Sequence, residues 1–225
     1  MRNINLRYVD ETFDENGLLK TYRLKCPDNF NFGYDIVDDI AAAEPDRVAL
    51  VWDSQSGEEH TFTFSDISRM SNKVANYLLS QGIGKGDVVM LILKQRYEFW
   101  FSMVALHKIG AIAAPATHML TKHDIEYRIN AASVKAVICT NQSNISGSVE
   151  HAENIPSLQL RALVGEKRDG WVDFDAEVEK ASDVLERIDT KVTDPMLMYF
   201  TSGTSDNPKM VLHSHRYALG HLMTA

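Results

Sequence analysis

One segment in the last thirty residues combines residue types that can bind phosphate. Residues 199–215 have the sequence YFTSGTSDNPKMVLHSH, in which a strand is expected before and after a stretch rich in hydroxyl groups. Backbone N–H groups and hydroxyls in such a turn can donate hydrogen bonds to phosphate oxygens, and a lysine adds a point charge. The same residue types also favour turns that bind nothing. The residues alone therefore leave both a phosphate loop and an ordinary turn open.

The P-loop of nucleoside triphosphatases is the first alternative to consider, because it is also a glycine-containing loop that ends in lysine. Its pattern requires glycine directly before the lysine and serine or threonine directly after it. Here Pro208 and Met210 flank Lys209. The segment therefore departs from the P-loop at two positions.

The segment is similar to the signature loop of the adenylate-forming superfamily, which includes acyl-CoA synthetases, luciferases and peptide-synthetase adenylation domains. The ending Pro208-Lys209-Met210 most resembles that of medium-chain acyl-CoA synthetases. The resemblance extends from about Phe32 to the end of the chain. Its upstream matches are residues 45–50 (PDRVAL), 63–67 (TFSDI), 84–88 (GKGDV) and 108–111 (KIGA) followed by Pro115.

The resemblance implies an acid–thiol ligase that activates a fatty or other carboxylic acid with ATP and Mg²⁺ and then transfers the acyl group from AMP to coenzyme A. Donors aimed at the departing phosphates would lower the barrier of the first step. It also implies which residues hold those phosphates: Thr201, Ser202, Gly203, Thr204, Ser205, Asp206, Asn207, Pro208 and Lys209. The family's remaining catalytic groups follow this loop, so we expect no catalytic residue and no ligase activity in this chain alone.

Two other functions stay open at this stage. An adenylating ligase for an aryl or amino acid shares the same loop, and the residues that would select the acid lie mostly downstream of it. A non-catalytic binding module is the alternative from a different class. Binding of nucleotide to the purified chain would distinguish a competent phosphate loop from such a module.

Asp206 occupies a position where the family usually has glycine. Aspartate tolerates left-handed backbone geometry better than most residues, so the turn can be kept. A carboxylate beside a triphosphate would nevertheless repel it. The sequence therefore predicts weak ATP binding, which glycine at position 206 should strengthen.

Strands alternate with helices along the chain, which predicts an α/β fold with mostly parallel, helix-covered sheets. We expect residues 1–32 to form an irregular arm, and residues 33–225 to be part of an N-terminal adenylation domain. Ser65 is the expected N-cap of one helix, and Thr121 with Asp124 is the expected capping box of another. We expect one helix between Ser65 and Gly82 and further helices at residues 35–43, 97–109, 121–132 and 174–181. We expect strands at residues 48–52, 60–64, 88–93, 111–114, 136–139, 160–164, 196–201 and 209–213.

Composition limits the other functions. The net charge of −8 argues against a nucleic-acid partner, and 44% hydrophobic residues are enough for a core. Cys26 and Cys139 are too few and too far apart for a disulfide framework or a zinc site. The first residues lack an apolar stretch, so we expect no signal peptide, and no apolar run approaches the roughly 20 residues of a membrane span. We therefore expect a cytoplasmic protein with no membrane span.

Three smaller features complete the sequence predictions. His213 and His215 are two residues apart but lack further ligands nearby, so no metal site is expected. The aromatic residues of segment 97–101 are expected in the core. Residues 217–225 resemble a helix without a stop signal, so we expect an N-terminal fragment that self-associates through apolar surface.

Overall fold

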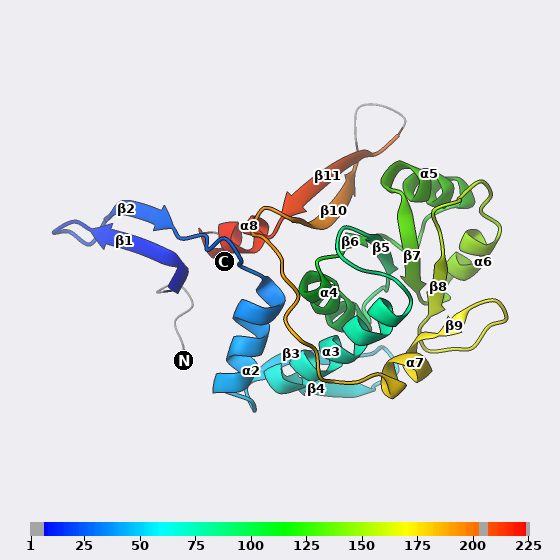
Figure 1. The fold of residues 1–225 in the computed structure, drawn as a ribbon, viewed down its shortest axis with the longest axis horizontal. Coiled ribbons are helices and arrows are strands. Elements are labelled where there is room, and N and C mark those ends of the chain that lie inside the picture. The colour runs from blue at the N-terminus through cyan, green and yellow to red at the C-terminus, as the bar shows by residue number, and fades with distance from the viewer. Residues whose placement is uncertain (1–6, 203–206, 224–225) are drawn as a thin grey trace.

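A seven-stranded sheet forms the centre of the protein. The computed structural model describes residues 7–202 and 207–223 (Figure 1). The strand order is β11-β10-β6-β5-β7-β8-β9, and every neighbouring pair is parallel except β10 with β11. The α/β prediction is thus confirmed. The strands are β5 (Val88–Ile92), β6 (Ile112–Pro115), β7 (Val134–Cys139), β8 (Leu160–Leu163), β9 (Val172–Asp173), β10 (Pro195–Thr201) and β11 (Lys209–Ser214).

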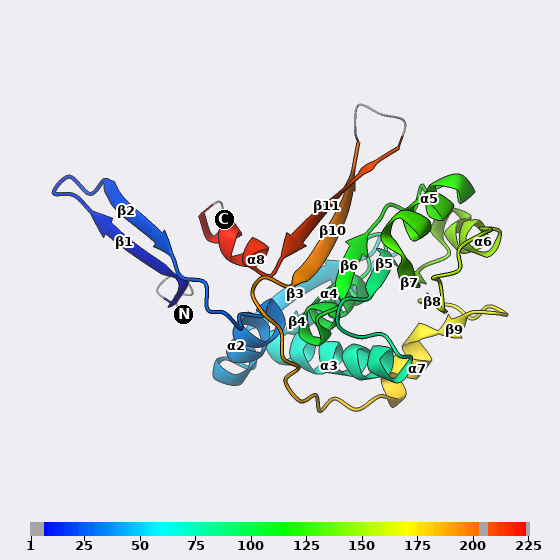
Figure 2. The same cartoon turned by 45° about the horizontal axis from the view of Figure 1, so that its top comes forward.

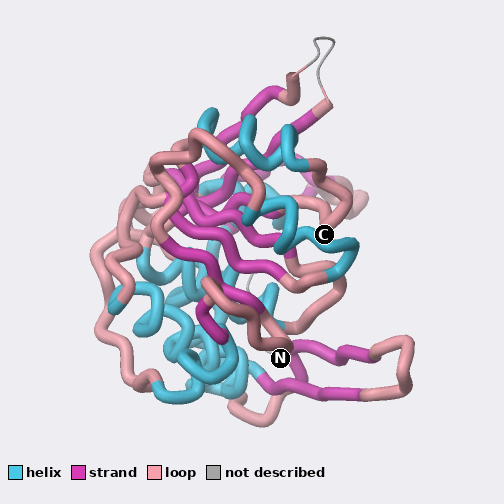
Figure 3. Tube along the Cα trace, turned by 90° about the vertical axis from the view of Figure 1, so that its right-hand side faces the viewer, coloured by secondary structure: helices cyan, strands magenta, loops and turns pink. Residues whose placement is uncertain are grey.

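Helices cover both faces of this sheet, which is why the central strand β5 is buried throughout. Successive side chains of a strand point to opposite faces. Leu91 accordingly packs in the cluster with α3, α4 and α7, whereas Met90 packs in the cluster with α5 and α6. Figure 3 shows the strands between these two groups of helices. The helices are α3 (Phe64–Ser80), α4 (Glu98–Ile109), α5 (Lys122–Ala132), α6 (Ile145–Glu150) and α7 (Phe174–Lys180).

The first thirty residues contain regular structure, so the expectation of an irregular arm was wrong. An antiparallel hairpin projects from the body of the molecule (Figures 1 and 2). The Asp14 carboxylate accepts hydrogen bonds from the backbone N–H groups of Asn16 and Leu18, and these close its turn. The remaining elements are β1 (Val9–Phe13), β2 (Leu19–Leu24), η1 (Gly33–Asp38), α2 (Asp39–Ala43), β3 (Val48–Asp53), β4 (Glu59–Thr63), η2 (Gln142–Asn144), α8 (Arg216–Gly220) and η3 (His221–Met223).

Capping boxes fix where two of the helices begin. In α5 the Thr121 hydroxyl accepts from the Asp124 N–H, and the Asp124 carboxylate accepts from the Thr121 N–H, as predicted. In α3 the same arrangement involves Thr63 and Asp66. The predicted N-cap Ser65 was therefore wrong by two residues, because a threonine followed three residues later by aspartate satisfies both free amides.

A buried lysine on α4 connects three helical elements. The Lys108 side chain is fully buried, although this helix was predicted to bury apolar residues. Its ammonium lies 2.7 Å from both the Asp38 carboxylate and the Asn72 amide oxygen. Burial lowers the pKa of Lys108, and the charge of Asp38 opposes this shift. A side chain at Gly33 would meet the lysine stem at 2.6 Å, so this packing requires glycine there.

Candidate functional site

The predicted phosphate loop connects β10 to β11 at an edge of the sheet. Thr201 lies opposite Lys209 in the antiparallel register, and its hydroxyl is 3.4 Å from the Lys209 carbonyl oxygen. Strand β10 pairs with β6 through Leu197, which lies opposite Ala113. Beyond this point β10 and β11 extend past the end of β6 (Figure 2). Thr201 ends β10 at the carboxyl edge of the parallel strands, the edge where open α/β sheets bind ligands.

The structure describes five of the nine predicted site residues. Gly203, Thr204, Ser205 and Asp206 lie outside the described residues. The side chains at the two described ends of the loop are accessible, because Thr201, Ser202, Asn207 and Lys209 are exposed and Pro208 is half-buried. Hydroxyl groups and an ammonium are therefore available to a ligand at the base of this loop.

Helix α5 contacts both ends of the loop, an arrangement that the sequence did not reveal. The Tyr127 hydroxyl donates a hydrogen bond of 2.9 Å to the Pro208 carbonyl oxygen. The Tyr127 ring also meets Phe200 edge to face, at 6.4 Å between centroids. Arg128 lies 5.3 Å from the same Phe200 ring. Because these partners are more than 70 residues apart in sequence, no local pattern could have identified them.

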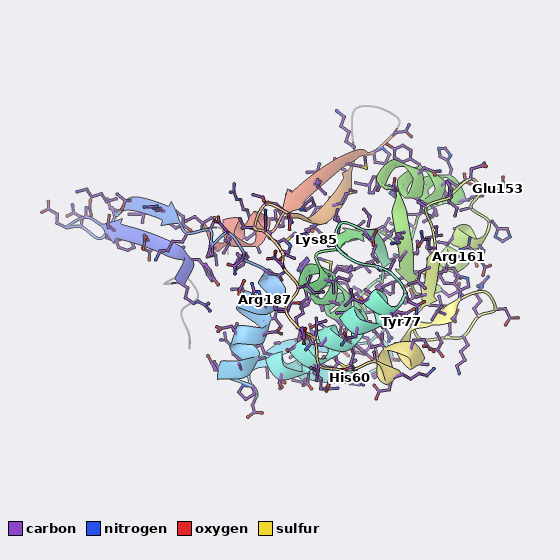
Figure 4. The ribbon with its side chains drawn as sticks, viewed as in Figure 1. His60, Tyr77, Lys85, Glu153, Arg161 and Arg187 are labelled. Carbon is purple, nitrogen blue, oxygen red and sulfur yellow. The ribbon has the colours of Figure 1, made fainter. Side chains whose placement is uncertain are left out.

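The connection between α7 and β10 holds β10 against the rest of the domain. Arg187 pairs with Asp35 of η1 at 2.8 Å, and Lys85 pairs with Asp194 at 2.8 Å just before β10 begins. Figure 4 shows Arg187 and Lys85 at two points along this connection. These contacts position the strand that leads into the predicted loop.

Two histidines, one in α4 and one directly after β11, are buried next to each other. The rings of His107 and His215 are 6.2 Å apart, and among the described residues neither has a hydrogen-bond partner on either nitrogen. Burial lowers the pKa of His107 to about 3 and that of His215 to about 4. Both imidazoles are therefore neutral near pH 7, and their rings pack edge to face between α4 and the residue that follows β11.

His213 and His215 face different surroundings. His213 packs 4.2 Å from the Tyr217 ring, whereas His215 is next to His107. Within residues 7–202 and 207–223, no three His, Cys, Asp or Glu side chains are grouped so that they could hold a metal ion. In the same part of the chain, no helix is long and apolar enough to cross a bilayer.

A groove of about 890 Å³ lies apart from the predicted loop, between the β3–β4 hairpin and the residues that follow β5. The Trp52 indole donates to the Gln95 carbonyl oxygen, and Arg96 lies 5.5 Å from the Trp52 ring. Lys94 also lines the groove. Trp100, expected in the core, is 50% exposed here. Lys94 and Arg96 lie at the carboxyl end of a central strand, but Asp53 and Glu58 line the groove as well and Arg96 pairs with Glu98, so the groove is a weaker candidate for an anion than the loop.

Solved structures show where this fold occurs. The chain superposes on an acyl-CoA synthetase from Brucella canis with a TM-score of 0.76 and 29% identity, covering 85% of this chain and 34% of that one. It also superposes on the anthranilate CoA ligase AuaEII with a TM-score of 0.73 and 24% identity, covering 84% of this chain and 36% of that one. The α/β fold is therefore that of the first part of such ligases.

The chain belongs to the family of AMP-binding enzymes, whose pattern matches residues 37–225. The acyl-coenzyme A synthetase ACSM5, mitochondrial, of Rattus norvegicus is 36% identical over 206 residues, which cover 86% of this chain and 35% of the relative. The Homo sapiens protein of the same name is 35% identical over 206 residues, which cover 88% of this chain and 35% of that relative. The chain spans about a third of the length of these relatives. The predicted superfamily is confirmed.

Proposed function

We propose that the loop between β10 and β11 binds the phosphates of ATP, in a protein that acts as an AMP-forming acyl-CoA synthetase. The observation that carries this proposal is the hairpin itself. It is at the carboxyl edge of the sheet, with the hydroxyl of Thr201 opposite Lys209 and the lysine side chain exposed. Family membership and the names of the relatives support the same reaction class.

The first half of the reaction defines what this loop does. A carboxylate oxygen of the acid attacks the α-phosphorus of ATP, the bond to the β-phosphate oxygen breaks, and pyrophosphate leaves. The thiolate of coenzyme A then displaces AMP from the acyl carbon. Negative charge grows on the departing phosphates in the first step, so the donors and cation of Thr201 through Lys209 stabilise it where it develops. Mg²⁺ would accompany ATP and would offset part of the charge on its phosphates.

The acid is a fatty or other carboxylic acid. The Pro208-Lys209-Met210 ending and the acyl-coenzyme A synthetase relatives favour this class over amino acids. We propose that residues 33–225 are part of the adenylation domain and that residues 1–32 form an N-terminal arm that leads into it. A cytoplasmic location stays a prediction, since the rat and human relatives are named as mitochondrial.

The proposal is tested by titrating pyrophosphate and Mg-ATP into the chain by calorimetry. Lys209→Ala removes the point charge and should weaken binding of both ligands at least tenfold, the effect of losing a charged hydrogen bond of about 1.5–3 kcal/mol. Lys167→Ala, which removes another exposed lysine, is the matched control. Asp206→Gly should tighten binding. Equal affinities of the wild type and Lys209→Ala would contradict the proposal.

A further inference from the structure

We propose that Tyr127 is a positioning residue for the phosphate loop and acts by orienting Lys209. This inference deepens the proposed function and depends on it. Tyr127 belongs to α5, a helix with no part in the loop sequence. Its hydroxyl nevertheless donates a 2.9 Å hydrogen bond to Pro208, the residue immediately before Lys209.

The chemistry of proline makes this one bond effective. Pro208 has no N–H, so its carbonyl oxygen is its only backbone hydrogen-bonding group. That oxygen and the N–H of Lys209 belong to the same planar peptide and point in opposite directions. A hydrogen bond that fixes the oxygen therefore fixes the direction of the Lys209 N–H and the starting point of its side chain.

The helix that carries Tyr127 is itself firmly placed. The Thr121 and Asp124 capping box fixes its first turn. Arg128 pairs with Asp124 at 3.1 Å, and its side chain is only 13% exposed. Ile125 is fully buried against the sheet. The Tyr127 hydroxyl is thus presented from a rigid element rather than from a mobile surface side chain.

The contacts of α5 reach both strands of the hairpin. Tyr127 and Arg128 pack on Phe200, directly before Thr201, while the Tyr127 hydroxyl binds Pro208, directly before Lys209. One helix turn therefore sets the separation of the two loop ends. The antiparallel pair of Thr201 and Lys209 then has a defined position relative to the sheet.

Tyr127→Phe is the variant that isolates this contact, because it keeps the ring on Phe200 and removes only the hydroxyl. We expect pyrophosphate to bind up to about tenfold more weakly, because a Lys209 that is no longer held must be ordered on binding and one lost hydrogen bond sets the limit of that cost. Tyr34→Phe is the matched control. The Tyr34 hydroxyl accepts a 3.1 Å bond from the Ile188 N–H, and Figure 1 shows α2, which continues η1, well away from the outer ends of β10 and β11.

Calorimetric titration of pyrophosphate and thermal unfolding are measured for the wild type and both variants. A purely structural role would lower the Tm of both variants and leave their affinities equal to that of the wild type. The proposal requires weaker binding by Tyr127→Phe alone, measured below both unfolding transitions. If the wild type binds pyrophosphate and Tyr127→Phe binds it with the same affinity, the proposed role of Tyr127 is wrong, whereas the phosphate site is still supported. Absence of binding by the wild type would overturn both.

Discussion

At the scale of single residues, the structure separates what a local pattern can predict from what it cannot. The box of Thr121 and Asp124 was predictable, because both partners lie within one helical turn. The bond of Tyr127 to Pro208 and the pairing of Lys108 with Asp38 were not, since each connects residues 70 or more positions apart. The candidate phosphate-binding residues were predicted from the loop sequence and its family resemblance. The side chains that position them could be identified only from the structure.

The two buried histidines predict how stability changes with pH. Their pKa values fall from 6.5 to about 3 for His107 and about 4 for His215 in the folded protein. The stability that they contribute is therefore complete above pH 6.5 and is lost as the pH falls towards 4 and then 3. In that range each imidazole adds a slope of about 1.4 kcal/mol per pH unit to the free energy of unfolding.

His107→Gln should reduce the pH dependence of the free energy of unfolding between pH 6 and pH 5 by about 1.4 kcal/mol per pH unit. The reason is that the unfolded variant no longer binds the proton of this imidazole. Urea unfolding at the two pH values measures it. His123→Gln, which replaces an exposed histidine, should keep the wild-type slope. The same pH dependence in the wild type and in His107→Gln would show that this imidazole is protonated alike in the folded and unfolded chains.

At the scale of elements, the predictions succeeded where burial and periodicity agreed. The continuous apolar run of β5 and the apolar α4 were both recognised, since each is covered by neighbouring elements. The hairpin of β1 and β2 was missed because its mostly exposed side chains give no apolar alternation. Its regular form depends on backbone pairing and on the turn that Asp14 closes.

Strand β11 combines an edge position with exposed apolar side chains. It is at one edge of the described sheet, and Met210, Val211 and Leu212 are 45%, 38% and 52% exposed. An exposed apolar edge strand is a template for pairing with another chain. We predict that the chain self-associates through this edge.

A charge on the edge strand should prevent that association. Val211→Lys is expected to sediment as a monomer at concentrations where the wild type forms larger species, because strand pairing would bury the added ammonium. Val184→Lys, at an exposed valine outside the strands, should behave as the wild type does. A wild type that stays monomeric at high concentration in sedimentation velocity would contradict the prediction.

At the scale of the whole molecule, the fold brings together a loop, a sheet edge and a bracing helix that are distant in sequence. The alternation of strands and helices was enough to predict the α/β class, and the order of the strands emerged only from the structure. Two regions at the carboxyl side of the sheet contain cations: the hairpin with Lys209, and the groove with Lys94 and Arg96, which Asp53 and Glu58 also line. Of these two, only the hairpin has the family's loop sequence.

The most direct test is therefore to locate a bound anion. A crystal structure of the chain with pyrophosphate should show the anion between the ends of β10 and β11, with the Lys209 ammonium about 3 Å from a phosphate oxygen. Pyrophosphate bound in the groove beside Lys94 and Arg96, with the hairpin empty, would contradict the assignment of the loop as the phosphate site.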